Sequence, residues 1–102
     1  MIIYNVTVNI DNDVHTEWVE WMKNIHIPDV MKTGFFKEYR FCRVLTDEPQ
    51  GHTYSIQYLC ESLTDYDRYQ KQEAPRLQAD HKSKYEGKFV AFRTILKMVD
   101  NG

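Results

Sequence analysis

The sequence contains few residues that interrupt or cross-link a chain: three prolines, four glycines and two cysteines among 102 residues. No repeat, linker or low-complexity segment interrupts the chain, and its composition is not that of a disordered protein. Cys42 and Cys60 fall on two neighbouring predicted strands, but a hairpin that pairs Leu45 with His52 does not bring the two cysteines face to face. Because a disulfide requires facing Cβ atoms, we expect two reduced thiols.

Long apolar runs and blocks of one charge are also absent. No run approaches the roughly 18 apolar residues of a membrane-spanning helix, and the first residues lack the basic stretch and cleavage site of a signal peptide. We therefore expect a cytoplasmic protein. With 13 basic and 15 acidic residues the formal charge is -2, and no Lys/Arg block occurs. The expected partners include neither nucleic acid nor a membrane.

The motifs of common cofactor and metal sites are missing as well. The sequence has no P-loop, no dinucleotide fingerprint, no Cys-x-x-Cys, no Gly-x-Ser-x-Gly and no His-Glu-x-x-His. Its four histidines are scattered without the spacing of metal ligands. We expect no metal and no cofactor, with haem as a minor alternative.

The chain does have the material for one hydrophobic core. Hydrophobic residues make up 42% of the sequence and aromatic residues 14%, including seven tyrosines. Its 102 residues are the size of one ordinary domain, so we expect residues 1–102 to form a single domain.

Hydrophobic periodicity predicts six elements in this domain. Alternating apolar residues predict four strands, and apolar residues that recur every three or four positions predict two helices, the second disturbed at Pro75. The order strand, helix, strand, strand, helix, strand is the ferredoxin-like α+β fold, a four-stranded antiparallel sheet with both helices on one face. The predicted ranges are 2–10, 14–33, 35–45, 52–60, 63–86 and 89–99.

The first helix carries the leading site candidate, His26, at the border of an apolar stripe. Pro28 disfavours helical geometry just before it, so His26 is expected on the last turn or at a kink, where its ring can reach a cleft. A neutral imidazole there can act as a general base or donate to a bound carbonyl. Alternatively, it only caps the broken helix end or hydrogen-bonds a tyrosine. The stripe consists of Trp18, Trp21, Met22 and Ile25.

Further candidates come from the second helix and from the strands. His81 lies on the apolar side of the second helix, where it either reaches the cleft or is a packed, hydrogen-bonded histidine. Aromatic side chains on the helix-facing side of the sheet can form the wall of a pocket, or they belong to the core. The residues predicted to contact a ligand are Trp21, His81, Tyr4, Tyr39, Tyr54, Tyr58 and Phe92.

The other face of the predicted sheet mixes polar and apolar side chains. It is too polar for a dry core and too broad for an idle surface, so a second subunit is its natural cover. Arg40 and Arg93 are predicted on this face, where guanidinium groups bond carboxylates or carbonyls across an interface.

The order of elements, the Trp-rich first helix and three short segments form a recognisable combination. The segments are His26-Ile27-Pro28, Thr33-Gly34-Phe35 and Phe92-Arg93-Thr94-Ile95-Leu96. With them, nearly the whole chain resembles a small bacterial family of unknown function in the dimeric α/β-barrel superfamily. More distantly, it is similar to antibiotic-biosynthesis monooxygenases, muconolactone isomerase-like proteins and haem-degrading monooxygenases. The resemblance implies a homodimer packed sheet to sheet and a ligand cleft between sheet and helices, but no particular reaction.

Two interpretations of function remain open. In the first, the protein is a non-catalytic dimeric domain that binds a small molecule or another protein. In the alternative, it is a cofactor-free monooxygenase- or isomerase-like enzyme that acts on a small hydrophobic carbonyl compound, with His26 as base or donor. We prefer the first, because a single histidine without an orienting carboxylate is thin support for catalysis.

Overall fold

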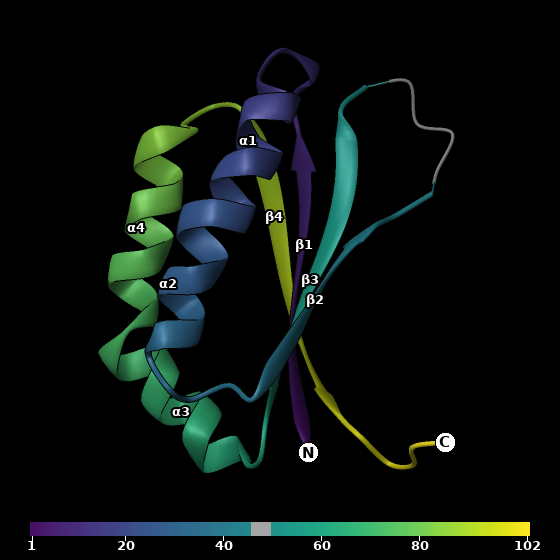
Figure 1. The fold of residues 1–102 in the computed structure, drawn as a ribbon, viewed down its shortest axis with the longest axis vertical. Helices are drawn as coiled ribbons and strands as arrows, with labels where there is room; N and C mark the ends of the chain where they lie inside the picture. The colour runs from purple at the N-terminus through teal and green to yellow at the C-terminus, as the bar shows by residue number, and fades with distance from the viewer. Residues whose placement is uncertain (46–49) are drawn as a thin grey trace.

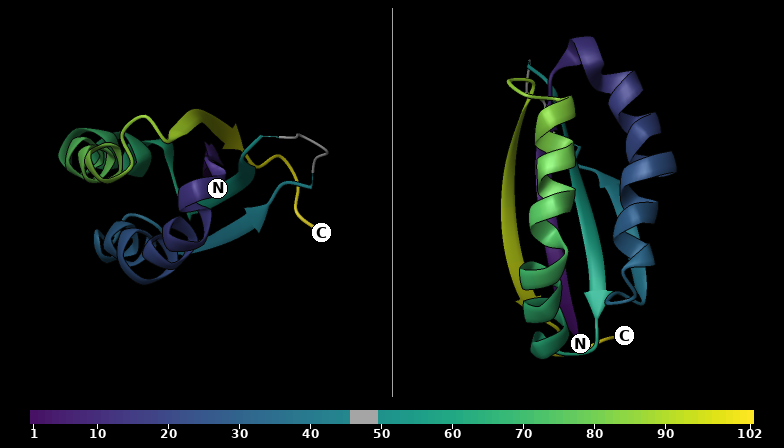
Figure 2. Two further views of the ribbon diagram at one scale, coloured as in Figure 1. Left: turned by 90° about the horizontal axis from the view of Figure 1, so that it is seen from above. Right: turned by 90° about the vertical axis from the view of Figure 1, so that its left-hand side faces the viewer.

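The computed structural model describes residues 1–45 and 50–102, and within them one four-stranded sheet carries helices on one face (Figure 1). The strand order is β2-β3-β1-β4, and all neighbouring strands are antiparallel. Figure 2 shows the helices side by side on the same face of the sheet, while the other face is uncovered. The predicted ferredoxin-like α+β fold is confirmed. The strands are β1 (Ile2–Ile10), β2 (Glu38–Arg43), β3 (His52–Cys60) and β4 (Phe89–Lys97).

Each connection on the helical face consists of more than one segment. The second predicted helix is divided just before Pro75, as expected for a residue that lacks a backbone donor. The hydroxyl of Ser62 accepts a hydrogen bond from the backbone N–H of Asp65 at 3.2 Å, which confirms the predicted helix start. The segments are the 3-10 turn η1 (Asn12–Val14), α1 (His15–Trp21), the π-helical η2 (Met22–His26), α2 (Ile27–Lys32), α3 (Leu63–Gln72) and α4 (Ala74–Lys84).

The π-helical segment η2 explains why the prediction that Ile25 belongs to the apolar stripe is wrong. A proline ring clashes with the carbonyl four residues before it in a regular α-helix, and the wider turn before Pro28 relieves this clash. Ile25, predicted in the apolar stripe, is 50% exposed. His26 ends the wide turn and is half-buried, which agrees with the predicted irregularity. The buried residues of this helix are Trp18, Met22, Ile27 and Val30.

The hairpin register predicted from the sequence is confirmed. Cys42 lies opposite Ser55, so the two cysteines do not meet. Both are free thiols, with Cys42 exposed and Cys60 buried. Burial raises the pKa of the Cys60 thiol, which keeps it protonated at neutral pH. The predicted loop between the two strands falls partly on residues 46–49, which lie outside the described residues.

The prediction of which side chains of β4 face the helices is wrong by one residue. Ala91 and Arg93 lie opposite Val8 and Val6 of β1, on the helix-covered face. Phe92 points to the open face and is 66% exposed. Because β4 has apolar residues on both faces, its alternation does not show which alternate residues face the helices. A shift of one residue moves every side chain to the other face of the sheet. Phe92 is therefore not a pocket wall, and Arg93 is not on the open face.

The open face of the sheet combines polar side chains with an apolar row on the edge strand β4. Arg40 of β2 lies on this face as predicted, opposite Gln57, and its guanidinium forms an ion pair with Glu38 at 3.6 Å. A row of this kind on an uncovered sheet is typical of an interaction surface. The apolar row consists of Val90 (57% exposed), Phe92 and Leu96 (41% exposed).

Candidate functional site

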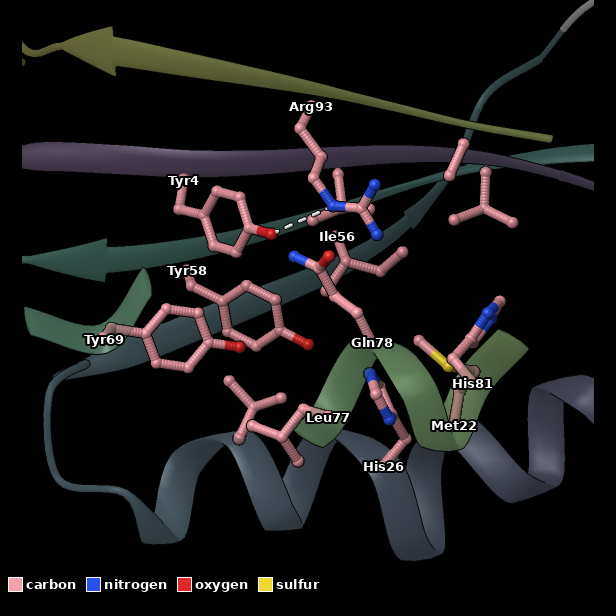
Figure 3. Close-up of a pocket in the computed structure, with 14 residues that line it drawn as sticks. Tyr4, Met22, His26, Ile56, Tyr58, Tyr69, Leu77, Gln78, His81 and Arg93 are labelled. Carbon is pink, nitrogen blue, oxygen red and sulfur yellow. Dashed lines mark hydrogen bonds between the residues drawn. The ribbon is translucent and has the colours of Figure 1, made fainter. Parts of the chain in front are cut away.

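A cavity lies between the helix-covered face of the sheet and the helices (Figure 3). The space open to the centres of water-sized molecules is about 40 Å³, which is room for roughly three waters. Together with its open mouth, the space between the atoms is about 460 Å³. Fourteen residues line the cavity: Tyr4, Val6, Val8, Met22, His26, Val30, Ile56, Tyr58, Tyr69, Leu77, Gln78, His81, Ala91 and Arg93.

Arg93 is the one exposed residue among these fourteen, so it marks the mouth of the cavity. Its Nε donates a hydrogen bond to the hydroxyl oxygen of Tyr4 at 3.2 Å. Figure 3 shows the rest of the guanidinium extending over the cavity, with the Gln78 amide of α4 pointing toward it. The ion pairs within residues 1–45 and 50–102 do not include Arg93. Its charge therefore has no internal counter-ion in this part of the chain.

His81 enters the cavity from α4 and is held in place by Trp18. The indole Nε1 of Trp18 donates a hydrogen bond to Nε2 of His81 at 2.9 Å. An accepting Nε2 places the proton of the neutral ring on Nδ1. Burial lowers the pKa of His81 to about 4, and the guanidinium of Arg93 and the His26 ring, which would repel it when protonated, act in the same direction. The ring is therefore neutral at pH 7 and fixed in orientation.

His26 reaches the cavity from the end of η2. Its ring stacks on Trp21 with 4.9 Å between ring centroids, and its centroid lies 5.6 Å from that of His81. Among the histidines of the described residues, His15, His52 and His81 have hydrogen-bonded rings, whereas the His26 ring has no such bond. Both ring nitrogens of His26 thus remain open to a ligand.

The His26 ring is also neutral at pH 7. Burial lowers the pKa of His26 to about 4, although the carboxylates of Asp29 and Asp80 act in the opposite direction. The guanidinium of Arg93 lowers this pKa further. The cavity therefore contains two neutral imidazoles and one guanidinium.

Three tyrosines form the aromatic end of the cavity. The ring of Tyr4 lies 6.0 Å from that of Tyr58 and 5.8 Å from that of Tyr69, measured between centroids. Burial raises the pKa of Tyr58 and of Tyr69, so both hydroxyls stay protonated. Each of them can donate a hydrogen bond to a bound group.

Four of the predicted site residues meet in this cavity: His26, His81, Tyr4 and Tyr58. Trp21 does not line the cavity but supports it, because its ring stacks against His26. Whether these residues contact a ligand stays a prediction.

The other three predicted contacts lie elsewhere. Tyr54 faces the helices but is engaged in a 2.6 Å hydrogen bond between its hydroxyl and Nε2 of His15. Tyr39 is 47% exposed on the edge strand β2, outside the cavity lining. Phe92 lies on the open face of the sheet, because the pairing of β4 with β1 turns Ala91 and Arg93, not Phe92, toward the helices.

Sequence reasoning missed Arg93, Gln78 and Tyr69 as lining residues. Tyr69 shares the apolar side of its helix with Leu77 and His81, so helical periodicity could have predicted that it faces the cavity. Arg93 had no such signal, because its direction depends on the pairing of β4 with β1.

Two kinds of feature are absent from residues 1–45 and 50–102. No group of three or more His, Cys, Asp or Glu side chains comes together in a way that could hold a metal ion. No helix in this part of the chain has the length and apolar character needed to cross a membrane.

One protein-family model accounts for nearly the whole chain. Residues 1–99 match a domain of unknown function, DUF4286. The chain belongs to this family. The resemblance to a family of unknown function, inferred from the sequence, is thereby confirmed. No curated protein matches the DUF4286 chain.

Solved structures share the fold of the DUF4286 chain at low sequence identity. A dimeric ferredoxin-like protein from an uncultured marine organism matches with a TM-score of 0.74 and 11% identity, over 100% of this chain and 98% of that one. SnoaB, a cofactor-independent oxygenase from Streptomyces nogalater, matches with a TM-score of 0.69 and 9% identity, over 98% and 95%. A mutant of MhuD with two manganese protoporphyrin IX molecules bound per active site matches with a TM-score of 0.72 and 12% identity, over 100% and 98%. At such identities the likeness shows the fold alone.

Proposed function

We propose that this protein binds a small molecule in the cavity between its sheet and its helices, and that it acts as a homodimer joined through the open faces of the two sheets. The observation that carries the first part is the convergence of four polar groups on one apolar cavity. They come from four different elements: Tyr4 from β1, His26 from η2, His81 from α4 and Arg93 from β4. An apolar pocket with a few convergent polar groups is the usual form of a ligand site.

The local backbone supports the same proposal. A π-helical turn is rare, and such turns occur frequently at functional sites. Here the turn ends at His26, whose ring faces the cavity without a hydrogen-bond partner among residues 1–45 and 50–102. Its nitrogens are accessible rather than buried, because the described residues contain no buried side-chain nitrogen or oxygen without a partner, so a ligand can reach them.

A cavity-filling variant tests the binding proposal. Ala91 of β4 lines the cavity and is half-buried, so Ala91→Leu places three additional carbons inside it. We expect fragments that bind the natural protein to lose at least about tenfold in affinity, since about 1.4 kcal/mol of lost contact accounts for that factor. The measurement is a titration of small aromatic carbonyl compounds followed by amide chemical shifts of the natural protein and of the variant.

The matched control for this test is Ala79→Leu, because Ala79 is exposed on α4 and does not line the cavity. This variant should bind the same fragments as the natural protein. If Ala91→Leu binds them equally well while its amide spectrum shows a folded chain, the ligands lie elsewhere and the proposal is wrong.

The proposed dimer rests on the apolar row of the open face. Exposed apolar side chains in a row on an uncovered sheet are stabilised by a symmetric partner that presents the same row. One of the similar structures is described as a dimeric ferredoxin-like protein, which supports this arrangement. A different protein partner on the same face is the remaining alternative.

A second candidate function is a cofactor-free enzyme in which His26 acts as base or hydrogen-bond donor toward a small hydrophobic carbonyl compound. The neutral, unpaired ring of His26 in the same cavity as a guanidinium favours it, because Arg93 can stabilise negative charge that forms on a ligand oxygen. A pKa near 4 leaves His26 in its basic form at pH 7 but makes it a weak base. This candidate therefore requires an acidic ligand proton.

The variant His26→Gln separates the two functions. If the protein is an enzyme, each bound carbonyl compound incubated with it in air-saturated buffer should give a product, and His26→Gln should lower the rate at least about 100-fold, within the usual range for loss of a general base. Binding of the same compound should change little. The products are followed by liquid chromatography with mass detection. If the compound is recovered unchanged from both proteins, the enzyme candidate is wrong and binding remains the proposed function.

A further inference from the structure

The polar groups of the cavity differ in kind from those of an ordinary apolar pocket. None of the fourteen lining residues is acidic, and Arg93 is the one lining residue that carries a full charge. Both lining histidines are neutral at pH 7, since burial lowers each pKa to about 4. The lining thus supplies one positive charge and no carboxylate, while Asp29 and Asp80, which act on His26, lie outside the lining.

The hydrogen bond to Tyr4 determines which donors remain available. The Nε of Arg93 is used by the Tyr4 hydroxyl, and Figure 3 shows the two remaining nitrogens of the guanidinium pointing away from Tyr4, over the cavity. Since the Tyr4 oxygen accepts this bond, its own hydrogen is free to be donated. A planar guanidinium held at one edge is well placed to bind two oxygens of one ligand group.

The remaining polar groups add donors rather than negative charge. Gln78 extends from α4 toward the guanidinium, and the hydroxyls of Tyr58 and Tyr69 point into the cavity (Figure 3). Their raised pKa values exclude a phenolate that could neutralise Arg93 at pH 7. Apolar side chains from the sheet and from the helices complete the lining, among them Val8 of β1, Met22 of η2 and Val30 of α2.

We infer that the ligand of this cavity is an organic anion, a small carboxylate whose oxygens bind the guanidinium of Arg93 and whose apolar part lies against the apolar side chains of the lining. The inference rests on the proposed binding function and specifies its ligand class. A neutral ligand of the same shape leaves the guanidinium without a counter-ion, whereas a carboxylate supplies one together with two acceptor atoms. The inner space of about 40 Å³ holds only part of such a ligand, and the open mouth, which brings the total to about 460 Å³, holds the rest.

Benzoate and benzamide test this inference, because they share a ring and differ in charge. The natural protein should bind benzoate at least about tenfold more tightly than benzamide, in line with the greater strength of charge-assisted hydrogen bonds. In Arg93→Gln the preference should disappear through weaker binding of benzoate, with benzamide little affected. Lys97→Gln is the matched control, since Lys97 is an exposed cation on the same face of β4 but outside the cavity lining. It should keep the preference.

The possible outcomes separate the ligand class from the binding function. Equal binding of benzoate and benzamide by the natural protein would overturn the anion inference and leave the cavity as a ligand site. A preference that persists in Arg93→Gln, or that disappears equally in Lys97→Gln, would overturn the role of Arg93. If neither compound shifts the amide signals of cavity residues, the anion inference fails here, and the proposed function then depends on the separate fragment titration of Ala91→Leu.

Discussion

Acidification from pH 7 to pH 4.5 is expected to lower the free energy of unfolding by about 2 to 3 kcal/mol for each of the two cavity histidines. The unfolded chain takes up protons on these rings near pH 6.5, whereas the folded protein does so only near pH 4. Between these values the unfolded state binds more protons, so falling pH favours it. The stability is complete above about pH 6.5 and is lost progressively down to about pH 4.

Urea unfolding at a fixed protein concentration, followed from pH 7 to pH 4.5, measures this loss. His81→Gln removes one of the two titrations and keeps an oxygen that can accept the hydrogen bond of Trp18, so the acid loss should fall by roughly half. Proton NMR of the two rings should give midpoints near pH 4. Midpoints near 6.5, or a free energy of unfolding that does not change down to pH 4.5, would contradict the neutral, buried state of these rings.

Phe92→Glu is expected to raise the dissociation constant of the proposed dimer by about 100-fold or more. Burying a phenylalanine stabilises by about 1.5 to 3 kcal/mol, and a symmetric interface contains each residue twice. Two carboxylates would also meet near the symmetry axis or remain desolvated, which adds to the loss. Phe92 is 66% exposed on the open face and away from the cavity, so the fold of the protomer should be retained.

Sedimentation velocity across a range of protein concentrations measures this dissociation. Leu63→Glu is the control, because Leu63 is 53% exposed at the start of α3 and does not belong to the open face of the sheet. It should leave the dimer intact. A natural protein that is monomeric at all concentrations, or a Phe92→Glu variant as dimeric as the control, would remove the sheet-to-sheet proposal.

The order of elements and the hairpin register could be predicted because each is encoded locally. Alternation over 2–10 and 52–60 identifies β1 and β3, and both strands have the predicted bounds. Ser62 begins a helix for a reason that involves only its near neighbours. Such signals do not depend on the rest of the fold.

The phase of β4 could not be predicted in the same way. Val90 and Phe92 on one face and Ala91 and Ile95 on the other are all apolar, so no side of this strand is marked as buried. Pairing with β1 decides the phase, and this is a non-local choice. Arg93, which carries the inferred specificity of the cavity, was missed for this reason alone.

The candidate site was predicted where a local irregularity marked it. His26 stood out because Pro28 follows the aromatic stripe, and His81 and Tyr4 because of their periodicity. The apolar stripe was predicted with a regular period of 3.6 residues per turn, which placed Ile25 in the core. The π-helical turn changes this period, and Ile25 is exposed.

That wide turn also sets the spacing of the buried side chains along the helix. Met22 and Ile27 are both buried and lie five positions apart, which is one more than a regular α-helix needs to return to the same face. The extra residue of the wide turn lets the buried side chains at its two ends share one face of the helix, although Pro28 follows directly. The same turn brings a histidine ring to the cavity without interrupting the apolar face.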